Sequence, residues 1–263
     1  MSNNSYPRTE YTLPKNKVSF SSLRSFLDCP ECWYRSRILG ESGRMGISLP
    51  IGNAIHEGLA EARRIAAGFK GEGDPLQVAA EQLDVEIGKI EPGLLDFEST
   101  AATPDEAKDL VVRLVKRGIE ILLPEEERRG IVAVESRPEY GHLFPFTIDG
   151  YIDVIIGGPV LLFKDLKSAR DGREPDGFYK AQLRLYTLPW HLAGQEVQMQ
   201  IDTLPKTGKT AWIPTAVETT GDGYESVREW VLKTAGQISD AMKSGDFPAH
   251  PGRFCDYPHP MAA

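Results

Sequence analysis

Two charged side chains, two residues apart, follow an apolar run in the segment LLFKDLKSA, residues 161–169. Residues two apart on a strand point to the same face, so Asp165 and Lys167 are expected to project together. At an exposed strand end such a pair would be a surface ion pair that contributes little. The apolar residues before it favour a buried strand instead, with an acid and a base held at its end.

A second acid, Asp153, lies in an alternating segment just before the turn GGP at 157–159. The turn predicts a β-hairpin of strands 147–156 and 160–167, which would bring Asp153 and Asp165 together. Two adjacent carboxylates raise each other's pKa unless a cation lies between them, and oxygen ligands suit Mg²⁺. A lysine beside a metal ion can orient water and stabilise negative charge on a phosphate. These residue types therefore predict phosphodiester hydrolysis.

The surrounding periodicity predicts an α/β chain with helices mostly before the strands. Apolar residues at helical spacing predict helices at 18–39 (broken at Pro30), 51–69, 76–90, 104–123, 178–194 and 224–245. Alternation predicts strands at 130–140 and 147–156, an apolar run predicts a strand at 160–167, and two more strands are expected within 196–219. Ser21 or Ser22 is expected to cap the first helix, and the helix over 104–123 is expected to end before Pro124.

Composition limits the class of protein. The chain has 263 residues and a formal net charge of -8, which argues against a general nucleic-acid coat but allows an enzyme with a narrow basic surface. No apolar run is long enough to span a membrane, and residues 1–17 are expected to be a polar arm without a secretory signal. Three cysteines are too few for a disulfide framework, so a cytoplasmic location is expected.

Five short motifs occur in a fixed order between about residues 20 and 190. They are S-x-L-x-x-F-x-x-C-P from Ser21, G-x-x-x-H ending at His56, G-x-x-D ending at Asp153, D-x-K ending at Lys167 and Q-x-x-x-Y ending at Tyr186. In this order they resemble the RecB-like branch of the PD-(D/E)XK nuclease superfamily.

The resemblance implies a restriction-endonuclease-like α/β core, with a central mixed β-sheet flanked by helices and an N-terminal helical lobe. One nuclease domain would cover 18–263. Within it, 18–125 would be mainly helical, 126–220 would form the catalytic sheet and 221–263 a C-terminal helix and tail.

The resemblance also implies metal ligands. His56, Asp153 and Asp165 match the side-chain ligands, and the backbone carbonyl of Leu166 would be a further one. The expected cofactor is Mg²⁺ or Mn²⁺.

Further site residues follow from the same resemblance. Lys167 matches the catalytic lysine, acting together with Asp153 and Asp165. Gln182 and Tyr186, which share a helix face, match residues that support the site or contact DNA. Glu135 falls where some relatives carry an additional acid.

The cysteines leave a second metal site open. Cys29 and Cys255 lie where some RecB-like nucleases bind an iron–sulfur cluster, but two further cysteines of that pattern are missing and Cys32 is extra. With His250 or His259 the three thiols could bind Zn²⁺ or an atypical cluster. The alternative is a tail of free thiols packed on the first helix.

The expected function is a metal-dependent deoxyribonuclease, an exonuclease of DNA recombination or repair of the phage or CRISPR-associated type. Its partners would be DNA and a recombinase or single-strand annealing protein, in an oligomer or as a single chain. The alternative is a catalytically silent DNA-binding or adaptor module with the same fold. The candidate DNA-binding residues are Arg35, Arg37, Arg170, Arg173, Lys180 and Arg184.

Overall fold

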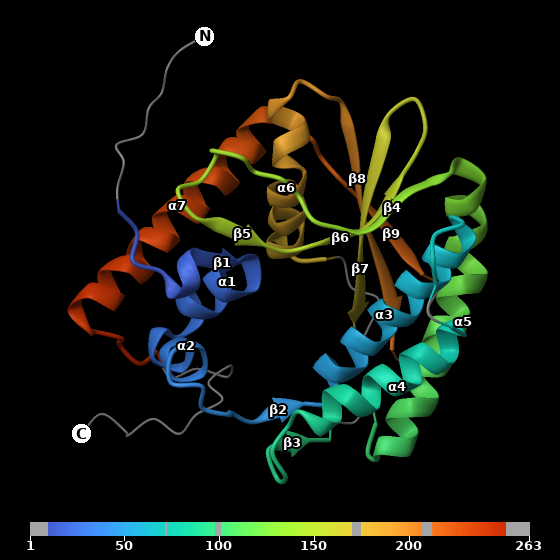
Figure 1. Cartoon of the computed structure of the whole chain (residues 1–263), viewed down its shortest axis with the longest axis horizontal. Coiled ribbons are helices and arrows are strands. Elements are labelled where there is room, and N and C mark those ends of the chain that lie inside the picture. Colours follow the sequence, from blue (N-terminus) through green and yellow to red (C-terminus); the bar gives the residue numbers. More distant parts are fainter. Residues whose placement is uncertain (1–9, 72, 98–100, 170–174, 207–211, 251–263) are drawn as a thin grey trace. The chain divides into compact units, whose positions relative to one another are not determined.

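The computed structural model describes residues 10–71, 73–97, 101–169, 175–206 and 212–250 (Figure 1). The chain divides into two compact units. The helical unit contains Met1–Gly43, Glu139–Gly150 and Tyr224–Ala263, and the sheet unit contains Arg44–Pro138 and Tyr151–Gly223. The single domain expected over 18–263 stays a prediction, because compactness alone does not show whether either unit folds by itself. In the described part of the chain, no helix has the length and apolar character that crossing a membrane requires.

The helical unit joins the first helices of the chain to the last. Its elements are the short 3-10 helix η1 (Pro14–Asn16), β1 (Lys17–Ser19), α1 (Phe20–Asp28), α2 (Pro30–Arg37), β5 (Thr147–Asp149) and most of α7 (Gly221–Ser244). β1 and β5 pair in parallel. The expected break at Pro30 is confirmed, with Cys29 between the two helices.

The capping of α1 differs from the sequence-based expectation. Ser19, not Ser21 or Ser22, is the N-cap, and its side chain accepts a hydrogen bond from the Ser22 backbone N–H at 3.1 Å. Ser22 instead lies inside the unit, where its hydroxyl accepts a hydrogen bond from the Trp33 indole at 2.9 Å. That bond links α1 to α2 and satisfies the buried indole N–H.

The sheet unit is built on five strands in the order β4-β6-β7-β8-β9. They are β4 (Ile131–Ser136), β6 (Ile152–Ile156), β7 (Leu161–Ala169), β8 (Val197–Pro205) and β9 (Ile213–Val217). Only β7 and β8 are parallel to each other, so the sheet is mixed, as expected. The crossover between these two parallel strands is made by α6 (Gly177–Leu192).

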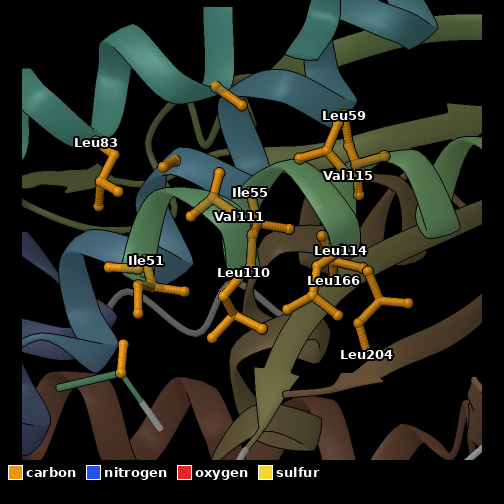
Figure 2. Packing of buried hydrophobic residues seen from close by; sticks show 14 of the residues in the cluster. Ile51, Ile55, Leu59, Leu83, Leu110, Val111, Leu114, Val115, Leu166 and Leu204 are labelled. Atoms are coloured by element: carbon orange, nitrogen blue, oxygen red, sulfur yellow. The ribbon is translucent and has the colours of Figure 1, made fainter. Parts of the chain in front are cut away.

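Three helices pack on one another beside this sheet, and the first of them contacts β4, β6 and β7 (Figure 1). They are α3 (Ser48–Ala66), α4 (Pro75–Gly88) and α5 (Pro104–Arg129), with two short parallel strands nearby, β2 (Met45–Gly46) and β3 (Leu95–Asp96). Figure 2 shows their core, which includes Ile55 of α3, Val111 of α5 and Leu166 of β7. α6 covers the other face, where Trp190 meets Phe163 at a ring-centre distance of 4.9 Å.

The predicted hairpin is confirmed for its second strand and shortened for its first. β6 and β7 pair antiparallel, but the strand expected over 147–156 is divided at Gly150 and Tyr151. Residues 147–149 form β5 and pair with β1 in the helical unit, where Asp149 lies 3.1 Å from Lys17 Nζ. Asp149 is therefore held in a different sheet from Asp153.

The helix α5 continues through Pro124 to Arg129, so the predicted end before Pro124 is wrong. Proline removes one backbone donor and disturbs the preceding turn, which usually costs several kcal/mol. The added turn buries the Glu126 carboxylate between two cations of the sheet unit. We infer that these contacts offset the cost of the proline.

Candidate active site

Three acids occupy corresponding positions on the neighbouring strands β4, β6 and β7. Val154 of β6 pairs with Val134 of β4 on one side and with Lys164 of β7 on the other. Continuing this register by one position aligns one acid from each strand, and we call these three residues the acidic row: Glu135, Asp153 and Asp165. Opposed residues on neighbouring strands have Cβ atoms about 5 Å apart, so the hairpin brings the two predicted acids together.

Asp153 is the one acid of the row whose pKa is lowered. It is 7% exposed, and its two oxygens have different partners: Oδ2 accepts the Leu166 backbone N–H, and Oδ1 lies 3.3 Å from His56 Nδ1. Burial alone would raise its pKa, but His56, Lys167 and the Leu166 N–H together lower the pKa of Asp153 to about 2. Asp153 is therefore an anion at neutral pH.

Asp165 is also buried and pairs with the lysine two residues on. Lys167 Nζ lies 2.7 Å from Asp165 Oδ2, but this oxygen has no well-aligned hydrogen bond. Burial and the charge of Asp153 raise the pKa of Asp165 against the opposing effect of Lys167. Asp165 thus has an oxygen whose capacity to accept from a donor or a cation is incompletely used.

Lys167 is an ammonium ion rather than a base. Burial lowers its pKa, but Asp165 and Asp153 outweigh burial and raise the pKa of Lys167 above its usual value. The ammonium also lies 4.9 Å from the centre of the Tyr179 ring of α6, a cation–π contact that restrains the long side chain. Tyr179 was not recognised in the sequence.

His56 reaches the acidic row from α3. A Cβ added at Gly52, one turn earlier, would lie 3.3 Å from Ser168 Oγ, so glycine allows α3 to approach β7 closely. Burial would lower the pKa of His56, but the charge of Asp153 raises it. The spacing G-x-x-x-H therefore combines a close approach with a side chain that meets Asp153.

Glu135, at the third position of the row, has an unusual backbone. Its φ is +50°, in the left-handed region that residues other than glycine seldom adopt. Burial, followed by the charge of Asp153, raises the pKa of Glu135 to about 7. Strained residues of this kind cluster at functional sites.

The α6 motif residues contact each other. Gln182 Nε2 donates a hydrogen bond to the Tyr186 hydroxyl at 3.1 Å, as the spacing of four residues predicts. Burial raises the pKa of Tyr186, and the charge of Asp165 adds to the shift. The helix thus brings a neutral phenol close enough to Asp165 to interact with its charge.

A buried ion quartet lies behind the acidic row and was not recognised in the sequence. Its members come from α3, α5, β7 and β8, and each is at most 5% exposed: Arg63, Glu126, Lys164 and Asp202. Glu126 accepts two hydrogen bonds from Arg63, at 2.8 and 3.0 Å, and one from Lys164 at 2.7 Å. Lys164 also lies 2.6 Å from Asp202. The only local signal was a lysine inside an apolar strand segment.

The predicted DNA-binding residues fall into three groups. Arg35 and Arg37 lie on α2 of the helical unit, where Arg35 Nε is 2.6 Å from Glu41. Lys180 and Arg184 lie on α6, where Arg184 donates to the Glu218 carbonyl at 3.2 Å. The remaining predicted residues, Arg170 and Arg173, lie outside the described residues.

The cysteines have a local structural role. The Cys29 sulfur caps α2 by accepting the Cys32 backbone N–H at 3.4 Å, and neither residue forms a disulfide. Cys255 and His259 lie outside the described residues, so the proposed cluster or Zn²⁺ site stays a prediction.

The donor set of the acidic row suits a hard divalent cation in its chemistry. Asp153 and Asp165 offer two carboxylates and His56 of α3 adds an imidazole, and Oδ2 of Asp165 is buried without an aligned hydrogen bond. As the side chains stand, however, these groups pair with one another. Within the described ranges, no three His, Cys, Asp or Glu residues are grouped closely enough to hold a metal ion together.

Comparisons with known proteins agree with this fold. The family profile of the PD-(D/E)XK nuclease superfamily matches residues 17–259, and the chain belongs to this superfamily. The recognition from sequence is confirmed at that level, and the class is that of phosphodiester-hydrolysing enzymes. No curated protein matches the sequence significantly.

Two solved structures are similar to the chain. One is a provisionally assigned exonuclease from Eubacterium rectale, with 11% identity and a TM-score of 0.53 over 94% of this chain and 91% of that one. At this identity the similarity supports the fold. The other, SSO0001, has 12% identity and a TM-score of 0.34 over 82% of this chain and 85% of that one, which is too low to inform the fold.

Proposed function

We propose that this chain is a metal-dependent deoxyribonuclease of the RecB-like branch that acts as an exonuclease in DNA recombination or repair. The observation that carries the proposal is the acidic row with Lys167 beside it, in a chain of the PD-(D/E)XK superfamily. The provisional exonuclease assignment of the Eubacterium rectale protein favours action on DNA ends. A cytoplasmic location and a recombinase or annealing partner belong to the same proposal.

The side chains of His56, Asp153 and Asp165, with the Leu166 carbonyl, would hold Mg²⁺ or Mn²⁺. Such a cation, when bound, makes a coordinated water more acidic and neutralises charge on the phosphate. The low pKa of Asp153 suits this role, because an acid that is ionised at neutral pH needs no deprotonation to bind a cation.

Lys167 would stabilise the negative charge that develops on the phosphate. Its raised pKa keeps it protonated, so it acts as a fixed positive charge and not as a general base. The Tyr179 ring restrains the Lys167 side chain, and Asp165 holds its ammonium group through an ion pair of 2.7 Å between Nζ and Oδ2. Gln182 and Tyr186 would orient the substrate or the acids from α6, and Lys180 and Arg184 would contact the DNA backbone.

The test is a nuclease assay on end-labelled linear and circular DNA, single- and double-stranded, with Mg²⁺, Mn²⁺ or EDTA. Wild type is compared with Lys167→Met, which removes the charge but keeps much of the side-chain volume. Lys116→Met on the exposed side of α5 is the matched control. We expect metal-dependent cleavage that is lost only in Lys167→Met and that spares circular DNA. Absence of cleavage by folded wild type would favour a silent DNA-binding module.

A further inference from the structure

An exposed arginine–tyrosine pair lies next to the acidic row. Arg137 Nη2 donates a hydrogen bond to the Tyr151 hydroxyl at 2.7 Å, and the guanidinium carbon lies 5.0 Å from the centre of the Tyr151 ring. Tyr151 keeps 45% of its surface exposed, and Arg137 is exposed as well. The reaction proposed above gives this pair no role.

Arg137 and Tyr151 are close in the sequence to two residues of the acidic row. Ser136, the last residue of β4, pairs with Ile152, the first residue of β6, so Arg137 and Tyr151 lie directly beyond this end of the two strands. Tyr151 precedes Asp153 by two residues, and two residues of chain span at most about 7 Å. The backbone of Tyr151 therefore lies within about one nucleotide's length of Asp153.

The chemistry of the pair suits a nucleotide whose base is unpaired. Exposed aromatic rings stack on nucleobases with little sequence preference, because every base has a π-face. An arginine beside the ring attracts phosphate and offsets the repulsion between DNA and the three acids. A base inside a duplex is already stacked on both faces, so only a frayed or single-stranded nucleotide offers a free face.

We propose that Arg137 and Tyr151 form the subsite for the nucleotide next to the cleaved phosphate, with its base unpaired and stacked on Tyr151. The proposal rests on the proposed nuclease function and adds a substrate class to it, a single-stranded or frayed DNA end. It also explains why a large aromatic ring stays exposed two residues before a buried acid.

The contact between Arg137 and Tyr151 could also act structurally, and the experiment has to distinguish that role from base stacking. The chain leaves the sheet unit after Pro138 and re-enters it at Tyr151, so the Arg137 hydrogen bond also fastens these two segments. Tyr151→Phe removes that hydrogen bond and keeps the ring. Tyr151→Leu removes both. A fastening role through the hydrogen bond predicts equal effects of the two variants, and one through the Arg137–ring contact predicts that Tyr151→Leu also lowers Tm. Stacking on a base predicts weaker oligonucleotide binding by Tyr151→Leu alone, at unchanged Tm.

The experiment measures the binding of a short fluorescein-labelled single-stranded oligonucleotide by anisotropy. The full chain carries Lys167→Met so that it does not cleave, and thermal unfolding is followed in parallel. The matched control is Phe69→Leu in the same unit, an aromatic residue that is also 45% exposed. A second series of oligonucleotides replaces one base at a time by an abasic site.

We expect Tyr151→Leu to raise Kd roughly five- to hundredfold, and Tyr151→Phe and Phe69→Leu to change it by less than about twofold. One abasic position should weaken binding by the parent but not by Tyr151→Leu, since the two changes remove the same contact. Equal effects of the Phe and Leu variants, or no such abasic position, would overturn the subsite while nuclease activity stands. A parent that binds no oligonucleotide, together with a wild type that cleaves none, would overturn both proposals.

Discussion

The buried ion quartet gives a prediction that does not depend on any activity. Replacing Glu126 by leucine removes the acceptor of two Arg63 hydrogen bonds and one Lys164 hydrogen bond. Lys164 still has an ion pair with Asp202 at 2.6 Å. The Arg63 guanidinium, which is only 3% exposed, loses its ion pair with Glu126. The variant should therefore be strongly destabilised.

The expected size follows from the burial of the partners. Removing one partner of a buried pair costs about 3–5 kcal/mol, because the remaining charge is left in the interior. For a protein of this size that corresponds to a fall in Tm of roughly 6–20 °C. In Arg63→Met/Glu126→Leu both charges are gone and Lys164 still has Asp202. Apolar replacement of whole buried pairs is often neutral, so this double variant should unfold within about 1 kcal/mol of wild type.

Urea unfolding followed by circular dichroism measures the free energies of unfolding of wild type, Glu126→Leu and Arg63→Met/Glu126→Leu. Asp84→Ala is the control, since the exposed ion pair of Asp84 with Lys108 should contribute no more than about 1 kcal/mol. The Arg63 and Lys164 charges outweigh burial and lower the pKa of Glu126, so its contribution is present above its usual pKa and declines as the pH falls below it. The reasoning would be refuted if Glu126→Leu were as stable as the control, or if the double variant were no more stable than the single one.

Three further results are expected. Mg²⁺ or Mn²⁺ should raise the Tm of wild type in thermal scans but not the Tm of Asp165→Asn. At a hundredfold excess of the metal over its Kd, the free energy of unfolding should increase by about 2.7 kcal/mol. An equal rise in Tm for both proteins would remove Asp165 from the ligand set. Burial raises the pKa of Glu135 from 4.5 to about 7. In EDTA, the wild type should therefore lose stability relative to Glu135→Gln as the pH rises through this range. Parallel curves of stability against pH for the two proteins would contradict the raised pKa. An added Cβ at Gly58 would lie 2.7 Å from that of Ala79, so Gly58→Ala should cost about 1–3 kcal/mol in urea unfolding, whereas Gly88→Ala, in open space, should not destabilise.

Local pattern was sufficient for the centre of the candidate site. The alternation of β6 and β7 and the turn between them fix which residues oppose each other, so the pairing of Asp153 with Asp165 follows from nearby sequence. The contact of Gln182 with Tyr186 follows in the same way from helical spacing. The mixed α/β fold was likewise predicted from the motif order and is confirmed.

Contacts between segments that are distant in the sequence could not be predicted from local sequence pattern. Nothing near Asp149 in the sequence indicates that it pairs with Lys17 of β1, which ends the predicted strand early. The helix past Pro124 was predicted to stop because proline is unfavourable there, and the compensating contacts come from other elements.

The sequence by itself therefore determined the acid–lysine strand, its hairpin partner and the order of motifs, because these depend on residue type and short-range periodicity. Only the tertiary structure decided that Lys164 and Arg63 are buried charges with partners and that Arg137 stacks on Tyr151. The physical reason is that a charge can be buried only where an opposite charge meets it. For Arg63 and Glu126 that meeting spans 63 residues of chain and is made by the packing of two helices.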